Sequence, residues 1–158
     1  MILPDVNVLV YTFRKDVERH SEYRGWLERV LNGSSAFGVS EQVLSSVVRI
    51  ATHPKIFRRP STSKAAFDFA RSIREHSLCR IVQPGGRHWS LFEKLCLTTG
   101  AKANLVTDAW HASLAIESGC TWITTDRDFA RFPGLSWMHP LDHETVIRNR
   151  DEPVTPGR

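Results

Sequence analysis

The sequence predicts an α/β protein with a central, mostly parallel sheet of four to five strands and helices on both faces. Two observations support this fold class. Short apolar runs alternate with helical patterns along most of the chain, which favours parallel strands joined by crossover helices. Acidic residues also recur where a predicted strand ends or a helix begins, and open α/β sheets bind ligands at that edge. The 158 residues are enough for one domain with a substantial core.

The first half of the chain contains two predicted strands. The first is a short apolar run that ends at Asp5, and the second covers residues 36–39 and is followed by Ser40, a typical helix N-cap. Apolar residues at helical spacing predict helices over residues 6–13, 17–31, 41–51 and 64–75. Residues 55–63 are basic and contain proline, so they are predicted to form an exposed loop.

The second half continues the alternation of strands and helices. Strands are predicted at residues 80–82, 121–125 and 135–138, and helices at residues 88–99 and 107–117. The tail over residues 151–158 is polar and contains two prolines, so we expect it to be disordered. We therefore expect a single domain over residues 1–141 and a C-terminal extension over residues 142–158.

Composition narrows the class of partner and the compartment. The chain has 21 Lys and Arg against 17 Asp and Glu, a net charge of +4 that mildly favours an anionic partner such as nucleic acid. Its three cysteines lie far apart and form no CxxC pair or zinc-type cluster. Neither a membrane-length apolar run nor a signal-peptide pattern is present, so we expect a cytoplasmic protein.

Four acidic positions follow one pattern along the chain. Asp5 ends the first strand, Glu41 opens a helix, Asp108 opens a helix rich in small residues, and Asp126 with Asp128 follows the strand before them. If the parallel strands align their C-terminal ends, all four positions can reach one crevice. Each acid alone also has a structural explanation, as a helix-dipole partner contributing about 0.3–1 kcal/mol or as a turn cap. Their joint placement favours a site.

Such a group of carboxylates requires a positive partner. No Lys or Arg occurs before Arg14, and closely spaced carboxylates repel one another unless a cation neutralises them. Oxygen ligands without Cys or His suit Mg²⁺ or Mn²⁺, bound as one or two ions. Such ions would hold a phosphodiester, lower the pKa of a bound water and neutralise the leaving oxygen.

The ordered motifs LPDVNVLV, SEQVLSSVVRIATHPKIF, NLVTDAWHASLAIESG and TTDRDFARFPGL resemble the PIN-domain ribonuclease toxins of the VapC type. The resemblance covers residues 1–141. It implies a PIN-like α/β/α sandwich and Mg²⁺- or Mn²⁺-dependent cleavage of RNA by the toxin of a type II toxin–antitoxin pair, which blocks translation and growth. It also implies inhibition by a cognate VapB-type antitoxin and a homodimer.

The same resemblance assigns roles to individual residues. The family's acidic positions fall on Asp5, Glu41, Asp108 and Asp126. Of these, the three aspartates are expected to bind the metal directly and Glu41 through water. Asp128 is either the alternative to Asp126 or an outer partner of the ligands, and Asn7 is expected to order the site. His111, one turn after Asp108, receives no role because nothing in this chemistry requires it.

A basic cluster lies outside these motifs and comprises Arg58, Arg59, Lys64, Arg71 and Arg74. Three interpretations stay open for it: contact with phosphates, contact with the antitoxin, or an ordinary solvated face. Arg58, Arg59 and Lys64 are the RNA-binding candidates among these residues.

Two other functions are compatible with parts of the pattern. A non-catalytic PIN-like RNA-binding or regulatory module would keep the fold but would not need the acids. A phosphatase with an aspartyl nucleophile at Asp5 would carry a second acid two residues later, where this chain has Asn7.

Overall fold

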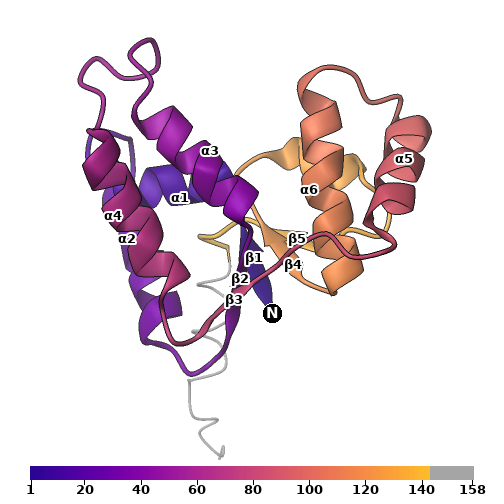
Figure 1. Cartoon of the computed structure of the whole chain (residues 1–158), viewed down its shortest axis with the longest axis horizontal. Coiled ribbons are helices and arrows are strands. Elements are labelled where there is room, and N and C mark those ends of the chain that lie inside the picture. The colour runs from indigo at the N-terminus through magenta and orange to yellow at the C-terminus, as the bar shows by residue number, and fades with distance from the viewer. Residues whose placement is uncertain (143–158) are drawn as a thin grey trace, which may run out of the picture.

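Strands lie between two groups of helices, with α1 to α4 on one side and α5 and α6 on the other (Figure 1). The computed structural model describes residues 1–142. Its strands are β1 (Ile2–Pro4), β2 (Phe37–Val39), β3 (Cys79–Ile81), β4 (Thr121–Ile123) and β5 (Trp137–Met138). Its helices are α1 (Val6–Phe13), α2 (His20–Asn32), α3 (Glu41–Ala51), α4 (Ser63–Arg74), α5 (His88–Thr99), α6 (Asn104–Ser118) and the short 3-10 helix η1 (Arg127–Arg131). Within these residues, every helix is too short or too polar to cross a membrane. The predicted extension over residues 142–158 lies outside the described residues from residue 143 onward.

Every strand pairing is parallel, as predicted, but the strands form two hydrogen-bonded sheets, β1-β4-β5 and β2-β3. The division follows from Pro4. The Asp5 amide donates to the Ile123 carbonyl at 2.8 Å, and the Thr121 amide donates to the Met1 carbonyl at 2.9 Å. Because the backbone groups of successive residues in a strand face opposite neighbours, those of Pro4 face away from β4. Pro4 has no amide hydrogen to give a second neighbour on that side.

Gly38 brings β2 against β1 despite this division. A Cβ atom at Gly38 would lie 3.3 Å from Leu3 Cδ1 and 2.9 Å from Val82 Cγ2. These distances leave no room for a side chain, so the absence of one lets the two sheets pack directly against each other.

The predicted helices form with modest shifts at their ends. α2 begins at His20 instead of residue 17, because the residues before it form turns. In these turns the Val17 amide donates to the Arg14 carbonyl, and the His20 amide donates to the Val17 carbonyl. α6 begins at Asn104 instead of residue 107, extended by a preceding turn. The inner face of α6 is built from small residues, Ala109, Ala112 and Ala115, and all three are fully buried.

Arg14 fastens the connection between α3 and α4 to the end of α1. The residue is only 8% exposed. The guanidinium donates to Asp16 at 2.6 Å, to Ser61 Oγ at 2.7 Å and to the Arg59 carbonyl at 2.8 Å, and it lies 4.1 Å above the Phe57 ring. The predicted basic loop is therefore anchored at its base by a buried cation that donates to Asp16, Ser61 and Arg59.

Candidate active site

Asp5 and Asp126 lie at the same edge of the sheet, and Asp108 joins them from a helix. β1 and β4 pair in register, Pro4 opposite Ile123, so both strands end at this edge. Asp5 then caps α1, and Asp126 caps η1 through its bond from the Asp128 amide. Asp108 comes from α6. The charges of Asp108 and Asp126 both raise the pKa of Asp5, which places the three carboxylates in one electrostatic group.

Asp5 is the most enclosed of these acids, with 7% of the residue exposed. Its Oδ1 accepts the Val6 amide at 2.6 Å, and its Oδ2 accepts the Thr124 hydroxyl at 2.6 Å. Both bonds lower the pKa of Asp5, but burial raises it more, and the neighbouring aspartates add to the rise, to about 6. The ionised form is therefore short of positive charge.

Thr124 connects two of the acids and has no role in the sequence-based prediction. Its hydroxyl donates to Asp5 and accepts the Asp126 amide at 3.0 Å. The residue was predicted as part of a strand over residues 121–125, whereas β4 ends at Ile123 and leaves Thr124 to turn toward Asp5. The sequence signal that could have identified Thr124 is a hydroxyl residue at the end of a predicted strand, two positions before Asp126.

Asp108 has the same deficit of positive charge. Its pKa is raised to about 6, first by burial and then by the charges of Asp126 and Asp128. Arg131 lowers the pKa of Asp108 but does not offset these effects. The guanidinium of Arg131 also pairs with Asp128 at 3.4 Å, where both side chains are exposed.

Asp126 and Asp128 differ in their surroundings. Asp126 is bound through both Thr124 and the Asp128 amide, and its charge acts on Asp5 and on Asp108. The side chain of Asp128 is 67% exposed, and its charge acts on Asp108. Asp126 is thus the more firmly positioned of the two.

Four buried side-chain polar atoms among residues 1–142 have no hydrogen-bond partner: Asn7 Oδ1, His111 Nδ1 and the indole nitrogens of Trp110 and Trp122. The His111 ring stacks on Trp122, with centroids 5.3 Å apart. Burial lowers the pKa of His111 to about 4, so the ring is uncharged near neutral pH and packs as a core residue. Asn7 Oδ1 is an oxygen acceptor in the first turn of α1, two residues after Asp5.

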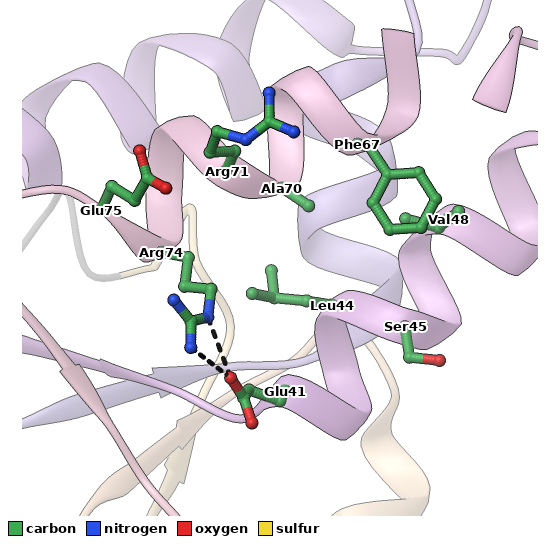
Figure 2. Close-up of a pocket in the computed structure, with 9 residues that line it drawn as sticks. All are labelled: Glu41, Leu44, Ser45, Val48, Phe67, Ala70, Arg71, Arg74 and Glu75. Carbon is green, nitrogen blue, oxygen red and sulfur yellow. Dashed lines mark hydrogen bonds and ion pairs between the residues drawn. The ribbon is translucent and has the colours of Figure 1, made fainter. Parts of the chain in front are cut away.

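Glu41 lies apart from the three aspartates in its interactions. Its Oε1 accepts hydrogen bonds from Arg74 of α4, at 2.9 Å from Nε and 2.7 Å from Nη2 (Figure 2). The pair lies at a groove of about 330 Å³ between α3 and α4. Leu44, Val48, Phe67 and Ala70 supply the apolar lining of the groove, and none of the three aspartates lines it.

The RNA-binding candidates lie on the α3–α4 connection and the start of α4. Arg58 and Arg59 are exposed, while the Arg59 carbonyl is held by Arg14. Lys64 is 84% exposed and pairs with Asp68 at 2.6 Å, an interaction typical of a solvated helix face.

The donors near Asp5 fit a hard divalent cation. They are carboxylate and amide oxygens, which Mg²⁺ and Mn²⁺ prefer. The raised pKa values of Asp5 and Asp108 and the unpartnered Asn7 Oδ1 indicate anionic and acceptor groups that lack a positive partner. Within residues 1–142, no three Asp, Glu, His or Cys side chains are close enough to form a ready-made binding group. Mg²⁺ is commonly held by one or two carboxylates and several waters, which this arrangement can accommodate.

Comparison with known proteins gives a consistent result. A model of the PIN domain matches residues 2–135. Ribonuclease VapC43 of Mycobacterium tuberculosis is 38% identical over 147 residues, which cover 93% of this chain and 100% of the relative.

Solved structures share the fold at lower identity. VapBC-1 of nontypeable Haemophilus influenzae has a TM-score of 0.64 and 18% identity, over 89% of this chain and 98% of that one. VapC20 of Mycobacterium tuberculosis, described as a Sarcin-Ricin loop cleaving toxin, has a TM-score of 0.60 and 18% identity, over 86% of this chain and 99% of that one.

Proposed function

This chain belongs to the PIN-domain family and, within it, to the VapC ribonucleases, and on that premise we propose that it is a Mg²⁺- or Mn²⁺-dependent endoribonuclease. It hydrolyses RNA phosphodiester bonds as the toxin of a type II toxin–antitoxin pair and so blocks translation and growth. The observation that carries the metal dependence is the convergence of Asp5 and Asp126 at one sheet edge with Asp108 beside them, where burial and the neighbouring acids raise the pKa values of Asp5 and Asp108. These acids hold more negative charge at the sheet edge than the nearby Arg131 offsets.

The metal site has an inner and an outer part. Asp5, Asp108 and Asp126 would hold one or two ions, each ion meeting one or two of these carboxylates and completing its coordination with water, and Glu41 would act through water. Asn7 orders the site with its unpartnered Oδ1, and Asp128 supports the ligands from outside. When bound, the cation neutralises the phosphodiester and lowers the pKa of the attacking water.

The chain's own groups prepare the site for this chemistry. The Thr124 hydroxyl donates to one oxygen of Asp5 and accepts the backbone amide of Asp126. These two bonds hold both acids in place before a ligand binds. His111 takes no part, because it is buried and uncharged.

The partners of the proposed toxin are RNA, a cognate VapB-type antitoxin and a second copy of the chain. The net charge of +4 supports an anionic substrate, with Arg58, Arg59 and Lys64 as contact candidates. Solved structures of this fold include toxin–antitoxin complexes, which supports the antitoxin. A toxin that acts on translation works in the cytoplasm.

Asp5→Asn tests this proposal. Purified wild-type and variant proteins are incubated with RNA in Mg²⁺ or Mn²⁺, and new 5′ ends are mapped. The variant should fold but lose cleavage, because it lacks a ligand and its negative charge. Glu28→Gln is the matched control, since Glu28 is a half-exposed acid of α2. Full cleavage by Asp5→Asn would refute the proposed site. RNA binding by the wild type without cleavage would favour the non-catalytic module, and a phosphorylated Asp5 would favour the phosphatase.

A further inference from the structure

The acid that opens α3 is held by a residue of α4. Glu41 and Arg74 are 33 positions apart, and two nitrogens of the Arg74 guanidinium meet the same oxygen of Glu41. Figure 2 shows this contact at one end of the groove, beside Leu44 and below Ala70. The contact is therefore tertiary, and it ties the first turn of α3 to the last turn of α4.

This contact gives Glu41 a cation that is hydrogen-bonded to it, whereas within residues 1–142 neither Asp5 nor Asp108 forms an ion pair. The pKa of Asp5 is raised by the charges of Asp108 and Asp126, and that of Asp108 by the charges of Asp126 and Asp128. Glu41 instead meets a guanidinium at 2.7 Å. A carboxylate oxygen that accepts two charged donors is a poorer ligand for a cation until those donors leave.

The contact can also open at little cost. The side chain of Arg74 is 50% exposed and that of Glu41 is 48% exposed. Ion pairs with this exposure contribute little to stability because water competes for both groups and salt screens them. Paired and released states of Glu41 therefore lie close in free energy, and a ligand that prefers one of them shifts the balance.

We propose that Arg74 is a positioning residue that competes with the divalent cation for Glu41. Paired with Arg74, Glu41 is kept in the groove; released, it completes the acidic group at the sheet edge. This inference rests on the proposed function, in which Glu41 is the fourth acid, and adds a residue that regulates metal occupancy. Binding of the cation and loss of the ion pair are then one linked equilibrium.

Mn²⁺ affinity, measured without RNA on the full chain by the electron paramagnetic resonance signal of free Mn²⁺, tests this competition. Arg74→Ala should lower the Kd for Mn²⁺ about two- to fivefold, the range that corresponds to an exposed ion pair. Arg71→Ala is the matched control, because Arg71 carries the same charge one turn earlier on α4 and lines the same groove. Its Kd should stay at the wild-type value.

A double-mutant cycle separates competition for Glu41 from a general effect of charge. In the Glu41→Gln background, Arg74→Ala should give no further gain in Mn²⁺ affinity. An equal gain in both backgrounds, or no gain in the Arg74→Ala variant, would overturn the proposal. Arg74→Lys, which keeps the charge but not the two-nitrogen contact, should give a smaller gain and serves as the second variant if Arg74→Ala unfolds.

The same titration distinguishes failure of this inference from failure of the proposed function. Asp5→Asn should weaken Mn²⁺ binding whatever Arg74 does. If Asp5→Asn binds Mn²⁺ as tightly as the wild type, the proposed metal site is wrong. If Asp5→Asn weakens binding while Arg74→Ala changes nothing, only the role of Arg74 is wrong.

Discussion

The acids at the sheet edge and the acid of the α3–α4 groove have the same chemistry in opposite surroundings. Asp5 is buried and Asp108 partly buried, and the charges of other aspartates help to raise the pKa of each to about 6. Glu41 is half exposed and pairs with Arg74. The difference shows that a carboxylate's position at a strand or helix end does not fix its electrostatic surroundings. Those depend on whether the fold places a cation or further carboxylates beside it.

The largest expected effect is on cleavage, in a comparison of Asp108→Asn with Glu41→Gln. In the proposed site Asp108 is a direct ligand, so its loss should lower kcat/KM by more than the roughly 10–100-fold typical of an outer partner. Glu41→Gln should stay within that range, because in the proposed site Glu41 acts through water and it is paired with Arg74. Both are measured with the same RNA at saturating Mg²⁺. Equal losses would erase the distinction between the two regions.

The next largest expected effect is a loss of Mn²⁺ affinity at acid pH, which depends on the acids at the sheet edge. Metal binding requires ionised ligands, and Asp5 and Asp108 take up protons as the pH falls through about 6. Between pH 6 and pH 5, the affinity for Mn²⁺ should fall about 5-fold if one ligand is protonated and about 30-fold if two are. Titrations at each pH measure this, and Glu41→Gln should show the same fall. A flat profile would contradict the raised pKa values.

Thr124→Val should have a smaller effect on the same quantity. The substitution keeps the shape but removes the hydroxyl that lowers the pKa of Asp5, so this pKa should rise further. Mn²⁺ affinity at pH 7 should fall about 10-fold, as for other outer partners. Thr124→Ser should restore it, and Thr125→Val is the neighbouring control. An unchanged affinity would mean that Thr124 only supports the turn after β4.

The smallest expected effect is on stability without metal. Because the folded state raises the pKa of Asp108 from 3.8 to about 6, it binds more protons than the unfolded state between these values, and stability falls as the pH rises through them. Asp108→Asn removes that cost, so in EDTA at pH 7 its Tm should exceed that of the wild type by about 2 °C. The gain should vanish at pH 4. Glu41→Gln should show no such gain in thermal unfolding.

The sequence was sufficient for the elements and the family but not for all contacts between them. Periodicity and caps predicted each helix and strand with small shifts at the ends, and the four motifs identified the family correctly. The division of the sheet depends on which neighbour Pro4 faces, and that becomes visible only once β1 pairs with β4.

Partners of the acids were the least predictable part. Arg74 appeared as one cation in a basic cluster, and nothing in its local sequence indicates Glu41, 33 residues earlier. Thr124 fits a strand by propensity, so its bond to Asp5, 119 positions away, was missed. Such contacts are set by the packing of α4 on α3 and of β4 on β1. The metal ligands and the RNA-binding residues stay predictions that the variants above can test.

Gly38 makes the spacing between the two acidic regions sensitive to a single carbon atom. It lies where β2 rests on β1, three residues before Glu41 and beside the strand that ends at Asp5. A methyl group there would meet Val82 Cγ2, beside β3, at 2.9 Å and Leu3 Cδ1 of β1 at 3.3 Å, so the packing of β2 against both neighbours, and with it the start of α3, would have to adjust. An engineer who wishes to retune how readily Glu41 reaches the aspartates could therefore change the sheet beneath both regions and leave every acid and every cation in place.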